Sequence, residues 1–385
     1  EALNADFDFT RNSSATRVGS NGLIQDVASN LPRIDYTGGV GSWKFEPQRT
    51  NEIIYSEDFS QWNITNSTIS LNQSISPDGT LNADEIADSS NAYGNFSTNI
   101  TSFSSSDYSI SLFIKKKQTT SAYLGIEVAG NGSYLTFNSA SGDLKFIGTN
   151  VFTNKKLISF NSDWWYLSFN INIASSNSTT LRIFPSISTN GSTLNAAANG
   201  TENIWGAQVE EGSYQTSYIR SNTGSATTRL ADVANNAGSS DLINSTEGVL
   251  YAEISALADD STNRQMTLSD GTNTNRLVLK YDNQSNIIQS FNRVGGVESA
   301  FLSATILDIT LFSKCLVKYK ENDYQLWING YKLDTDTNST VWPSSTLNDF
   351  KINEGGGADF FGNVKCLSVF KEALTDLELE CLVSW

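Results

Sequence analysis

The sequence predicts an all-β protein: two antiparallel β-sandwich (jelly-roll) domains in tandem, with an extended N-terminal arm and a short C-terminal helix. Short runs of alternating apolar and polar residues are separated by Asn-Gly, Asp-Gly and Ser-rich turns, which is the pattern of half-buried strands. Only 17% of the 385 residues are charged, and Asn, Ser, Thr and Gly fill the surface-type positions instead. The chain is longer than one hydrophobic core usually supports, so two domains are expected.

The pattern of residues 1–50 predicts an extended N-terminal arm. Short alternating segments such as Phe7–Arg11 are separated by turn residues, and Asn21-Gly22 is a strong signal for a hairpin turn. Because this segment is too thin to bury a core, we expect it to pack on the following domain or on neighbouring subunits.

The alternating segments in residues 51–220 predict the first sandwich. The alternation in its last strand predicts Trp205, Ala207 and Val209 on one face, with Gln208 and Glu210 on the other. Gly212 and Ser213 end that run. Strands are expected at Phe59–Ile64, Tyr108–Ile114, Tyr123–Val128, Tyr134–Phe137, Leu144–Ile147, Trp164–Ile173, Leu181–Phe184 and Ile204–Val209.

Residues 221–240 contain few large apolar side chains, and this composition predicts a linker. Alternating segments return in residues 241–385 and predict a second sandwich. One of its strands ends at Asn329-Gly330, a hairpin-turn dipeptide. Its last strand, near Val364–Phe370, is followed by a short helix, where Thr375 and Glu378 have the spacing of a capping box. Further strands are expected at Gly248–Ile254, Gln265–Leu268, Arg276–Tyr281, Ile287–Phe291, Cys315–Tyr319 and Tyr324–Ile328.

Several motifs resemble known proteins. Trp205–Tyr214 (WGAQVEEGSY) resembles the end of the carbohydrate-binding-module-like jelly rolls found in bacteriophage structural proteins. The run from Pro32–Tyr36 (PRIDY) to Glu46–Asn51 (EPQRTN) resembles a leader that precedes such domains, and Thr227–Asp232 (TTRLAD) resembles their trailing motif. The segments 323–331 and 361–379 resemble the concanavalin A-like, laminin-G-type lectin fold. The resemblance implies a phage virion protein with two lectin-like sandwiches.

Charge and composition exclude several classes of partner. The net charge is -16, which disfavours nucleic acids and anionic membranes because both are bound through positive charge. No run approaches the roughly 20 apolar residues of a membrane span, and the first residues lack the basic and apolar regions of a signal peptide. We therefore expect a soluble protein without membrane insertion.

The residue inventory also argues against an enzyme. Histidine is absent, which removes Ser-His-Asp, Cys-His and His-metal sites together. The second-domain strands lack the alternating acidic residues that concanavalin-like glycosidases carry along one strand. Cys315, Cys366 and Cys381 are odd in number without a Cys-x-x-Cys spacing, so buried free thiols are expected rather than a disulfide framework or a zinc site.

Two kinds of binding residue are candidates. Tyr93 and Trp342 are aromatic residues within polar loops, where a ring can cover the apolar side of a sugar, although anchoring of the loop is the alternative role for each. Acidic loop clusters could supply oxygen ligands to a structural Ca²⁺ ion, although their spacing is irregular and a solvated acidic loop is the alternative. The candidate Ca²⁺ ligands are Asp84, Asp88, Asp259 and Asp260.

The sequence thus favours a non-enzymatic virion protein on the particle exterior: a head fibre, a capsid decoration or a tail appendage. Its expected partners are other virion proteins, copies of itself, with a homotrimer favoured, and surface glycans. Weak sugar sites would gain affinity through multivalency. The alternatives are a bacterial secreted or cell-surface glycan-binding protein, and a purely architectural virion subunit that binds no sugar.

Overall fold

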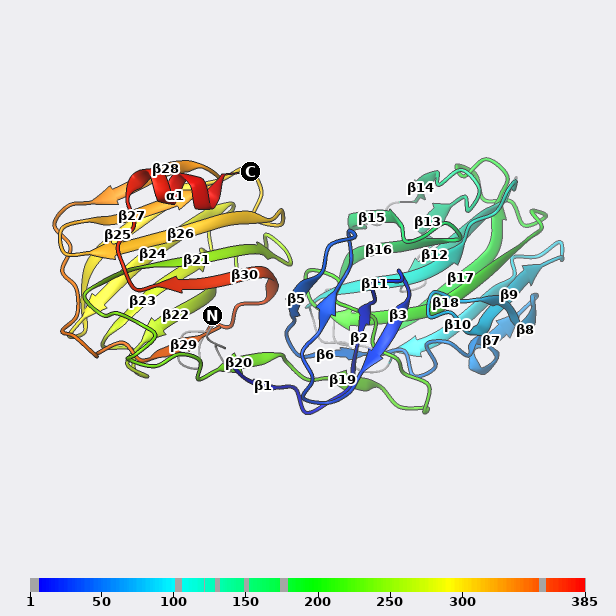
Figure 1. Ribbon diagram of the computed structural model, residues 1–385. Coiled ribbons are helices and arrows are strands. Elements are labelled where there is room, and N and C mark those ends of the chain that lie inside the picture. Colours follow the sequence, from blue (N-terminus) through cyan, green and yellow to red (C-terminus); the bar gives the residue numbers. More distant parts are fainter. Residues whose placement is uncertain are drawn as a thin grey trace. The chain divides into compact units, whose positions relative to one another are not determined.

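The computed structural model describes residues 7–100, 106–120, 122–128, 132–148, 152–173, 179–352 and 358–384. Within these ranges the chain forms antiparallel β-sheets, one short 3₁₀ helix η1 (Phe59–Gln61) and one α-helix, α1 (Asp376–Val383) (Figure 1). The predicted all-β fold class with a short C-terminal helix is confirmed.

The chain divides into two compact units. The first sandwich comprises residues 13–27 and 48–229, and the second sandwich comprises the described residues of 7–12, 28–47 and 230–384. The arm expected at residues 1–50 therefore divides between the two units, and the linker expected at 221–240 divides near residue 229.

The first sandwich consists of two six-stranded sheets. Sheet I has the strand order β14 (Leu144–Ile147), β13 (Tyr134–Phe137), β12 (Tyr123–Val128), β17 (Thr179–Ser188), β10 (Asn95–Ile100) and β7 (Asn63–Thr65). Sheet II has the order β15 (Thr153–Ser159), β16 (Trp164–Ile173), β11 (Ser106–Lys115), β18 (Gly200–Glu211), β9 (Leu81–Asp88) and β8 (Thr68–Ile75). Two small pairs accompany them: β2 (Ala15–Val18) with β3 (Ile24–Val27), and β6 (Arg49–Asn51) with β19 (Thr227–Arg229).

The second sandwich consists of a seven-stranded and a five-stranded sheet. Sheet III has the order β28 (Tyr331–Asp336), β27 (Tyr324–Ile328), β26 (Ser313–Lys320), β21 (Glu247–Ala256), β30 (Gly362–Phe370), β5 (Ser42–Phe45) and β4 (Ile34–Asp35). Sheet IV has the order β25 (Val297–Thr305), β24 (Ile287–Val294), β23 (Arg276–Tyr281), β22 (Arg264–Ser269) and β29 (Asp349–Lys351). A further pair joins β1 (Asp8–Thr10) to β20 (Val233–Asn235).

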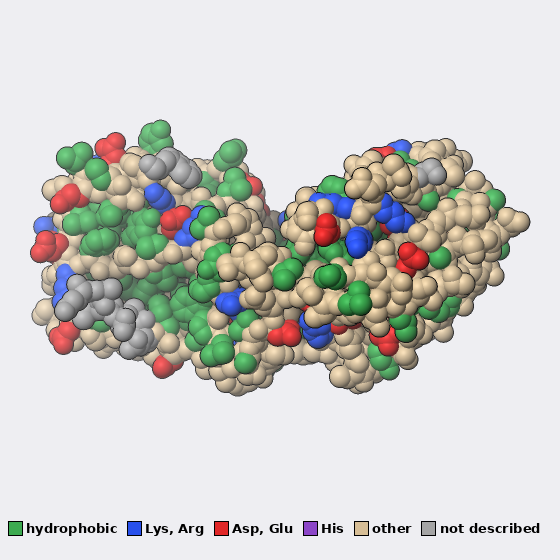
Figure 2. Space-filling model, turned by 45° about the vertical axis from the view of Figure 1, so that its right-hand side comes forward, with side chains coloured by type: hydrophobic (Ala, Val, Ile, Leu, Met, Phe, Trp, Pro, Cys, Tyr) green, Lys and Arg blue, Asp and Glu red, His purple; other side chains and the backbone are tan. Residues whose placement is uncertain are grey.

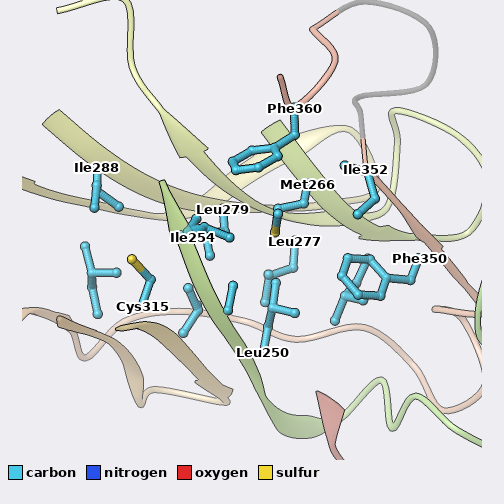
Figure 3. Packing of buried hydrophobic residues seen from close by; sticks show 14 of the residues in the cluster. Leu250, Ile254, Met266, Leu277, Leu279, Ile288, Cys315, Phe350, Ile352 and Phe360 are labelled. Carbon is cyan, nitrogen blue, oxygen red and sulfur yellow. The ribbon is translucent and has the colours of Figure 1, made fainter. Parts of the chain in front are cut away.

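Alternation along the strands separates each core from the surface. In the first sandwich Leu124, Ile126 and Val128 of β12 point inward and are at most 1% exposed, and they belong to the same cluster as Ile183 of β17. In the second sandwich the same alternation buries Leu250, Ile254, Met266 and Leu277, among others (Figure 3). Burial of these side chains is the main stabilising term of both units.

A β-bulge corrects the faces predicted for the last strand of the first sandwich. The register between β11 and β18 shifts so that Gly206 and Ala207 together face Leu112. Gly206 has φ +66°, a conformation that side chains other than glycine rarely adopt. The extra residue reverses the alternation, so Trp205 points to the outer face of sheet II while Ala207 and Val209 point into the core.

Trp205 is nevertheless fully buried, because a second layer covers the outer face of sheet II. This layer includes the β2–β3 hairpin and the chain returning through Tyr218. Ile24 of the hairpin packs in the same cluster as Trp205, Phe113 and Trp164. The hairpin predicted at Asn21-Gly22 is confirmed, with Gly22 at φ +75°.

The polar residues of the same motif hold the returning chain. Glu210 is fully buried and accepts hydrogen bonds from the backbone N–H (2.7 Å) and the hydroxyl (2.5 Å) of Thr216. Gln208 accepts one from the N–H of Ile219 at 2.6 Å. Asn51 donates to the carbonyls of Ala207 and Ile219. These bonds satisfy backbone groups that leave the regular ladder, so the motif closes the fold.

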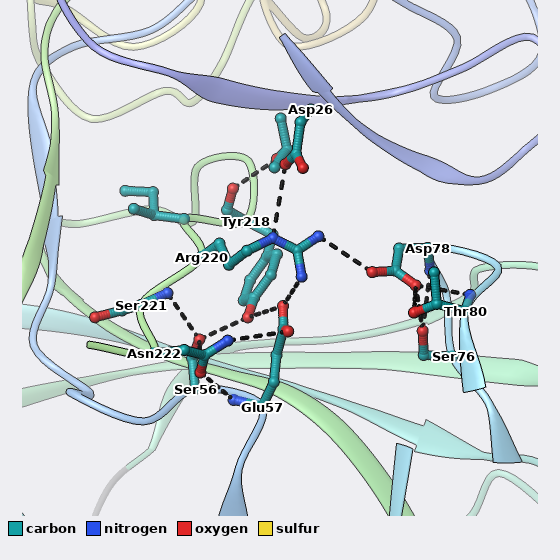
Figure 4. A network of polar contacts seen from close by, with 12 residues as sticks. Asp26, Ser56, Glu57, Ser76, Asp78, Thr80, Tyr218, Arg220, Ser221 and Asn222 are labelled. Carbon is teal, nitrogen blue, oxygen red and sulfur yellow. Dashed lines mark hydrogen bonds and ion pairs between the residues drawn. The ribbon is translucent and has the colours of Figure 1, made fainter. Parts of the chain in front are cut away.

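Arg220 lies at the centre of a second polar network in the first sandwich (Figure 4). It forms ion pairs with Glu57, with Asp78 at 3.1 Å and with Asp26 of β3 at 3.7 Å. The hydroxyl of Tyr218 donates to Glu57 at 2.9 Å. Burial opposes the charge of Arg220, yet these carboxylates raise its pKa above the ordinary value. The network joins the β2–β3 hairpin to the jelly roll, although the Arg220 side chain remains 32% exposed.

The second sandwich contains a fully buried ion network. Arg11 pairs with Asp232 at 2.9 Å, and Arg33 pairs with both Asp232 and Glu46, the latter at 2.7 Å. The N–H of Glu46 donates to Asp232 at 2.9 Å, and the N–H of Asp232 donates to the Glu46 carbonyl at 3.0 Å. All four side chains are at most 2% exposed. The leader and trailing motifs therefore meet in this network.

Two further expectations about local structure are confirmed and one is wrong. Asn329 and Gly330 form the two-residue turn between β27 and β28, and Thr375 and Glu378 form the capping box of α1. The strand expected at 59–64 is instead η1 followed by β7, because Asp58 accepts a hydrogen bond from the N–H of the second η1 residue and caps a helical turn.

Candidate functional site

The outer face of sheet I carries a polar row across four neighbouring strands. Asn63 of β7 is paired with Ser97 of β10, Ser97 with Arg182 of β17, and Arg182 with Glu127 of β12. The residues on either side of Glu127 and of Arg182 point into the core, so the row faces outward. Directly paired residues on one face are close enough for their side chains to interact.

Glu127 and Arg182 form the charged centre of this row. An Nη1 nitrogen of Arg182 lies 2.8 Å from the Oε2 oxygen of Glu127, and the N–H of Gly132 donates to Oε1 at 2.8 Å. The Glu127 side chain is only 4% exposed, whereas that of Arg182 is 34% exposed. The carboxylate is thus fixed below the surface, and it orients a guanidinium that still presents N–H donors to solvent.

Aromatic rings lie beside the charged pair. Tyr134 of β13 packs edge to face on Phe184 of β17, with ring centroids 5.0 Å apart. Burial raises the pKa of Tyr134, and the nearby carboxylate of Glu127 raises it further. Tyr93, which is 37% exposed, lies in the loop that leads into β10 of sheet I. Tyr134 itself is half-buried, so part of its ring remains accessible.

This arrangement can bind a flat polar ligand with one apolar side. The ring of Tyr134 offers apolar area, and Arg182, Ser97 and Asn63 offer hydrogen-bonding groups on the same face. A pyranose ring has this combination of an apolar side and surrounding hydroxyls. The strand ladder fixes the backbone of every member, so little conformational entropy is lost on binding.

The two aromatic candidates from the sequence have different outcomes. Tyr93 is 37% exposed in the loop before β10, and its role as a sugar contact stays a prediction. Trp342 is corrected: it is 1% exposed, packs edge to face on Tyr319, and donates its indole N–H to the carbonyl of Arg293 at 2.6 Å. No face of its ring is open to a sugar, because the segment that carries it folds into the second core.

The candidate Ca²⁺ ligands are not brought together. Asp84 and Asp88 lie in strand β9, which corrects their placement in a loop, and each accepts backbone N–H bonds. They also line separate cavities. Asp259 accepts a hydroxyl hydrogen bond from Ser285, and Asp260 pairs with Arg264 at 2.8 Å. In the described part of the chain, no group of three or more acidic or cysteine side chains could hold a metal ion.

The three cysteines are free thiols, but they do not share one environment. Cys315 is buried, and burial raises its pKa to about 12. Cys366 is half-buried and Cys381 is exposed on α1, which corrects the expectation that all three are buried. The amphipathic pattern of a short surface helix leaves one side in solvent, and Cys381 falls on that side.

Sequence reasoning missed Glu127, Tyr134 and Arg182. The available signal was a charged residue within an otherwise apolar strand, as in the run from Tyr123 to Val128 and in the run from Leu181 to Phe184. A charge at such a position has to lie on the outward face or find a partner. The pairing of β12 with β17 could not be inferred from the sequence.

No family model matches the sequence, and no curated protein matches it. Among solved structures, a heptameric SAP-like pentraxin from Limulus polyphemus has a TM-score of 0.32 and 14% identity, covering 39% of this chain and 74% of that chain. Sheep galectin-11 in complex with glycerol has a TM-score of 0.25 and 10% identity, covering 32% of this chain and 90% of that chain. Domains LG4-5 of the mouse laminin α1 chain have a TM-score of 0.25 and 9% identity, covering 90% of this chain and 96% of that chain.

Identities and TM-scores this low assign neither a ligand nor a partner to the chain. Among the described residues, no helix combines the length and the apolar character needed to cross a membrane.

Proposed function

We propose that the chain is a non-enzymatic glycan-binding protein, and that the outer face of sheet I is its sugar site. The observation that carries this proposal is the polar row from Asn63 to Glu127 with Tyr134 beside it. The row combines fixed donors and acceptors with an accessible ring on one rigid surface. Such a combination suits a sugar better than an apolar or a highly charged ligand.

A surface of this kind binds weakly on its own. A shallow sugar site is typically worth about 4 to 5 kcal/mol, which corresponds to roughly millimolar affinity. Several linked copies raise the overall affinity by orders of magnitude without any new contact. We therefore propose a homo-oligomer, with a homotrimer as the favoured form, that presents several copies of the face at once.

We further propose that this protein is part of the exterior of a bacteriophage virion, as a head fibre, a capsid decoration or a tail appendage. The support is the resemblance of the leader, the closing motif and the trailing motif to those of phage structural proteins. Several polar residues of these motifs have a common physical role in this chain, because all of them are buried anchors of the fold. They are Arg33, Glu46, Asp232, Gln208 and Glu210. Detection of the protein in purified particles, with accessibility to antibody, tests this placement, and its absence from particles contradicts it.

A glycan array tests the sugar site. The assembled protein should bind a subset of glycans, and Arg182→Ala or Tyr134→Ala should weaken that binding at least tenfold, because each removes a direct contact worth about 1.4 kcal/mol or more. Tyr331→Ala is the matched control, since Tyr331 is 70% exposed and belongs to the second sandwich. Melting curves of each variant check that the fold persists.

Two results would contradict the sugar site. The first is the absence of glycan binding in both the assembled and the monomeric protein, which favours a purely architectural subunit. The second is equal loss of binding in the Tyr331 control, which places the site elsewhere. Turnover of a polysaccharide, lost when one acidic residue is replaced, would contradict the non-enzymatic assignment.

A further inference from the structure

Strand β30 has one incompletely covered edge. On one side it pairs with β21 from Gly362 to Phe370. On the other side β5 pairs only with Gly362–Val364. No other strand in the described part of the chain pairs with residues 365–370 on that side. Alternate backbone N–H and C=O groups of this segment are therefore left without a ladder partner.

An apolar groove of about 820 Å³ runs beside this free edge. Leu367 and Val369 of β30 line it together with Trp43, Ile243 and Phe350. Leu367 and Val369 pack against the core of the second sandwich yet remain half-buried, whereas their strand partners on β21, Ala252 and Leu250, are fully buried. The core is thus open to solvent along this edge.

The apolar surface continues beyond the groove. Phe370 lines both the groove and a second cavity of about 430 Å³ formed with Leu374, Leu377 and Leu382. Leu377 of α1 is 72% exposed. Figure 2 shows hydrophobic side chains gathered over part of the second sandwich. Extended apolar surface of this kind marks an interaction site more often than an accident of packing.

Strand β5 shows how this edge accepts a strand. It comes from the arm, far from β30 in sequence, and adds to the sheet with Trp43 opposite Val364. The chain reaches this edge through the turn that contains Gly38 and Gly39, both with positive φ. A second strand could continue along β30 from the point where β5 ends, by the same antiparallel or by a parallel ladder.

The charges around the groove define the chemistry of that strand. Its charged lining residues are Lys365 and Lys371, which lie at the two ends of the free segment and are both exposed. Lys365 also pairs with Glu253 at 3.4 Å. Six residues of strand span about 20 Å, so an extended segment of six to eight residues would reach both lysines.

We propose that the free edge of β30 binds one extended strand of a partner protein, apolar at alternate positions and acidic at its ends. Backbone hydrogen bonds to residues 365–370 would supply register. The alternate apolar side chains would fill the groove over Leu367 and Val369, and the terminal carboxylates would meet the two lysines.

Selection from a library of random nonapeptides, displayed against the full chain, tests this binding mode. Selected peptides should have apolar residues at alternate positions and Asp or Glu at an end. A selected peptide should slow amide hydrogen exchange in residues 362–371. Val369→Lys should weaken its binding at least tenfold, whereas Val297→Lys should not, because Val297 is a 69% exposed strand residue of the same sandwich, outside the groove.

Lys371→Glu provides a variant that leaves the core intact. Selection against this variant should lose the preference for an acidic end and favour a basic one. The proposal is overturned if peptides lack the alternation, if protection falls outside β30, or if Val369→Lys binds as the wild type does. Self-association of the chain that is abolished by Val369→Lys would also overturn it, since a second copy would then be the occupant.

Discussion

The two sandwiches fix their arm segments with arginine networks that differ in exposure. In the second sandwich Arg11 and Arg33 meet Glu46 and Asp232 with side chains at most 2% exposed. In the first sandwich Arg220 meets three carboxylates, but its own side chain is 32% exposed. Arginine–carboxylate ion pairs thus occur in the buried interior of one sandwich and at the solvent-exposed surface of the other.

The difference in exposure determines what each network contributes. A buried ion pair gains little over an apolar replacement, but loss of one partner leaves an uncompensated charge that is very costly. An exposed pair is screened by water and salt, and its loss costs little. We therefore expect the two networks to differ several-fold in the free energy of unfolding lost on removing one arginine.

The largest effect is expected for Arg33. Arg33→Ala removes the guanidinium that pairs with Glu46 and one of the two that pair with Asp232, so the free energy of unfolding should fall by about 3 to 5 kcal/mol. Urea denaturation followed by tryptophan fluorescence measures this change. A loss below about 1 kcal/mol would show that water or a neighbouring group compensates the two carboxylates, and would remove the distinction between the networks.

Glu202 provides an intermediate case, a carboxyl buried in the first sandwich with incomplete pairing. Ser139 donates to its Oε1 oxygen at 2.9 Å and Lys117 lies 3.6 Å away, while Oε2 has no hydrogen-bond partner. Burial raises the pKa of Glu202 to about 7, and the charge of Lys117 only partly opposes this. The folded protein therefore holds this proton to a higher pH than the unfolded chain does.

This raised pKa predicts the direction of a pH dependence. The stability that the protonated carboxyl contributes is fully present below about pH 4.5 and is lost as the pH rises through about 7. Glu202→Gln should remove this loss and make the protein more stable than wild type at pH 8, by about 3 kcal/mol. Urea denaturation at pH 5 and pH 8 measures it, and parallel pH profiles for the two proteins would contradict it.

The smallest effect is expected for Arg220. Arg220→Ala should lower the free energy of unfolding by about 1 kcal/mol, because the side chain is one-third exposed. The deficit should shrink in 1 M NaCl, where the Debye length is about 3 Å. Comparison with Arg33→Ala in the same buffers makes each variant the control for the other. A deficit as large as that of Arg33→Ala, unchanged by salt, would mean that the network is effectively buried.

The sequence predicted the fold class well because period-two alternation and turn dipeptides are local signals. Asn21-Gly22, Asn329-Gly330 and the capping box at Thr375 were all found where expected. The faces around Gly206 were wrong because the alternation rule holds only while the ladder is unbroken. A single glycine with positive φ within a strand was the available warning.

The candidate site was harder to predict because it consists of residues from strands that are distant in sequence. Tyr93 was identified from its polar loop, but Glu127 and Arg182 are 55 residues apart and meet only through the pairing of β12 with β17. Trp342 was misjudged because its polar neighbours conceal a side chain that belongs to the core. Local composition thus identified an exposed aromatic residue in the loop before β10 but none of the residues of the polar row.

The position of β5 in the sequence has a consequence for synthesis of the chain. Its partner β30 begins at Gly362, so the ribosome must add more than 300 residues before Phe45 can find its place in sheet III. At about 5 to 20 residues per second, that delay is on the order of half a minute. During this time Trp43 and Phe45 have no β30 to pair with, so their aromatic side chains lack their final packing partners until the last strand has been synthesised.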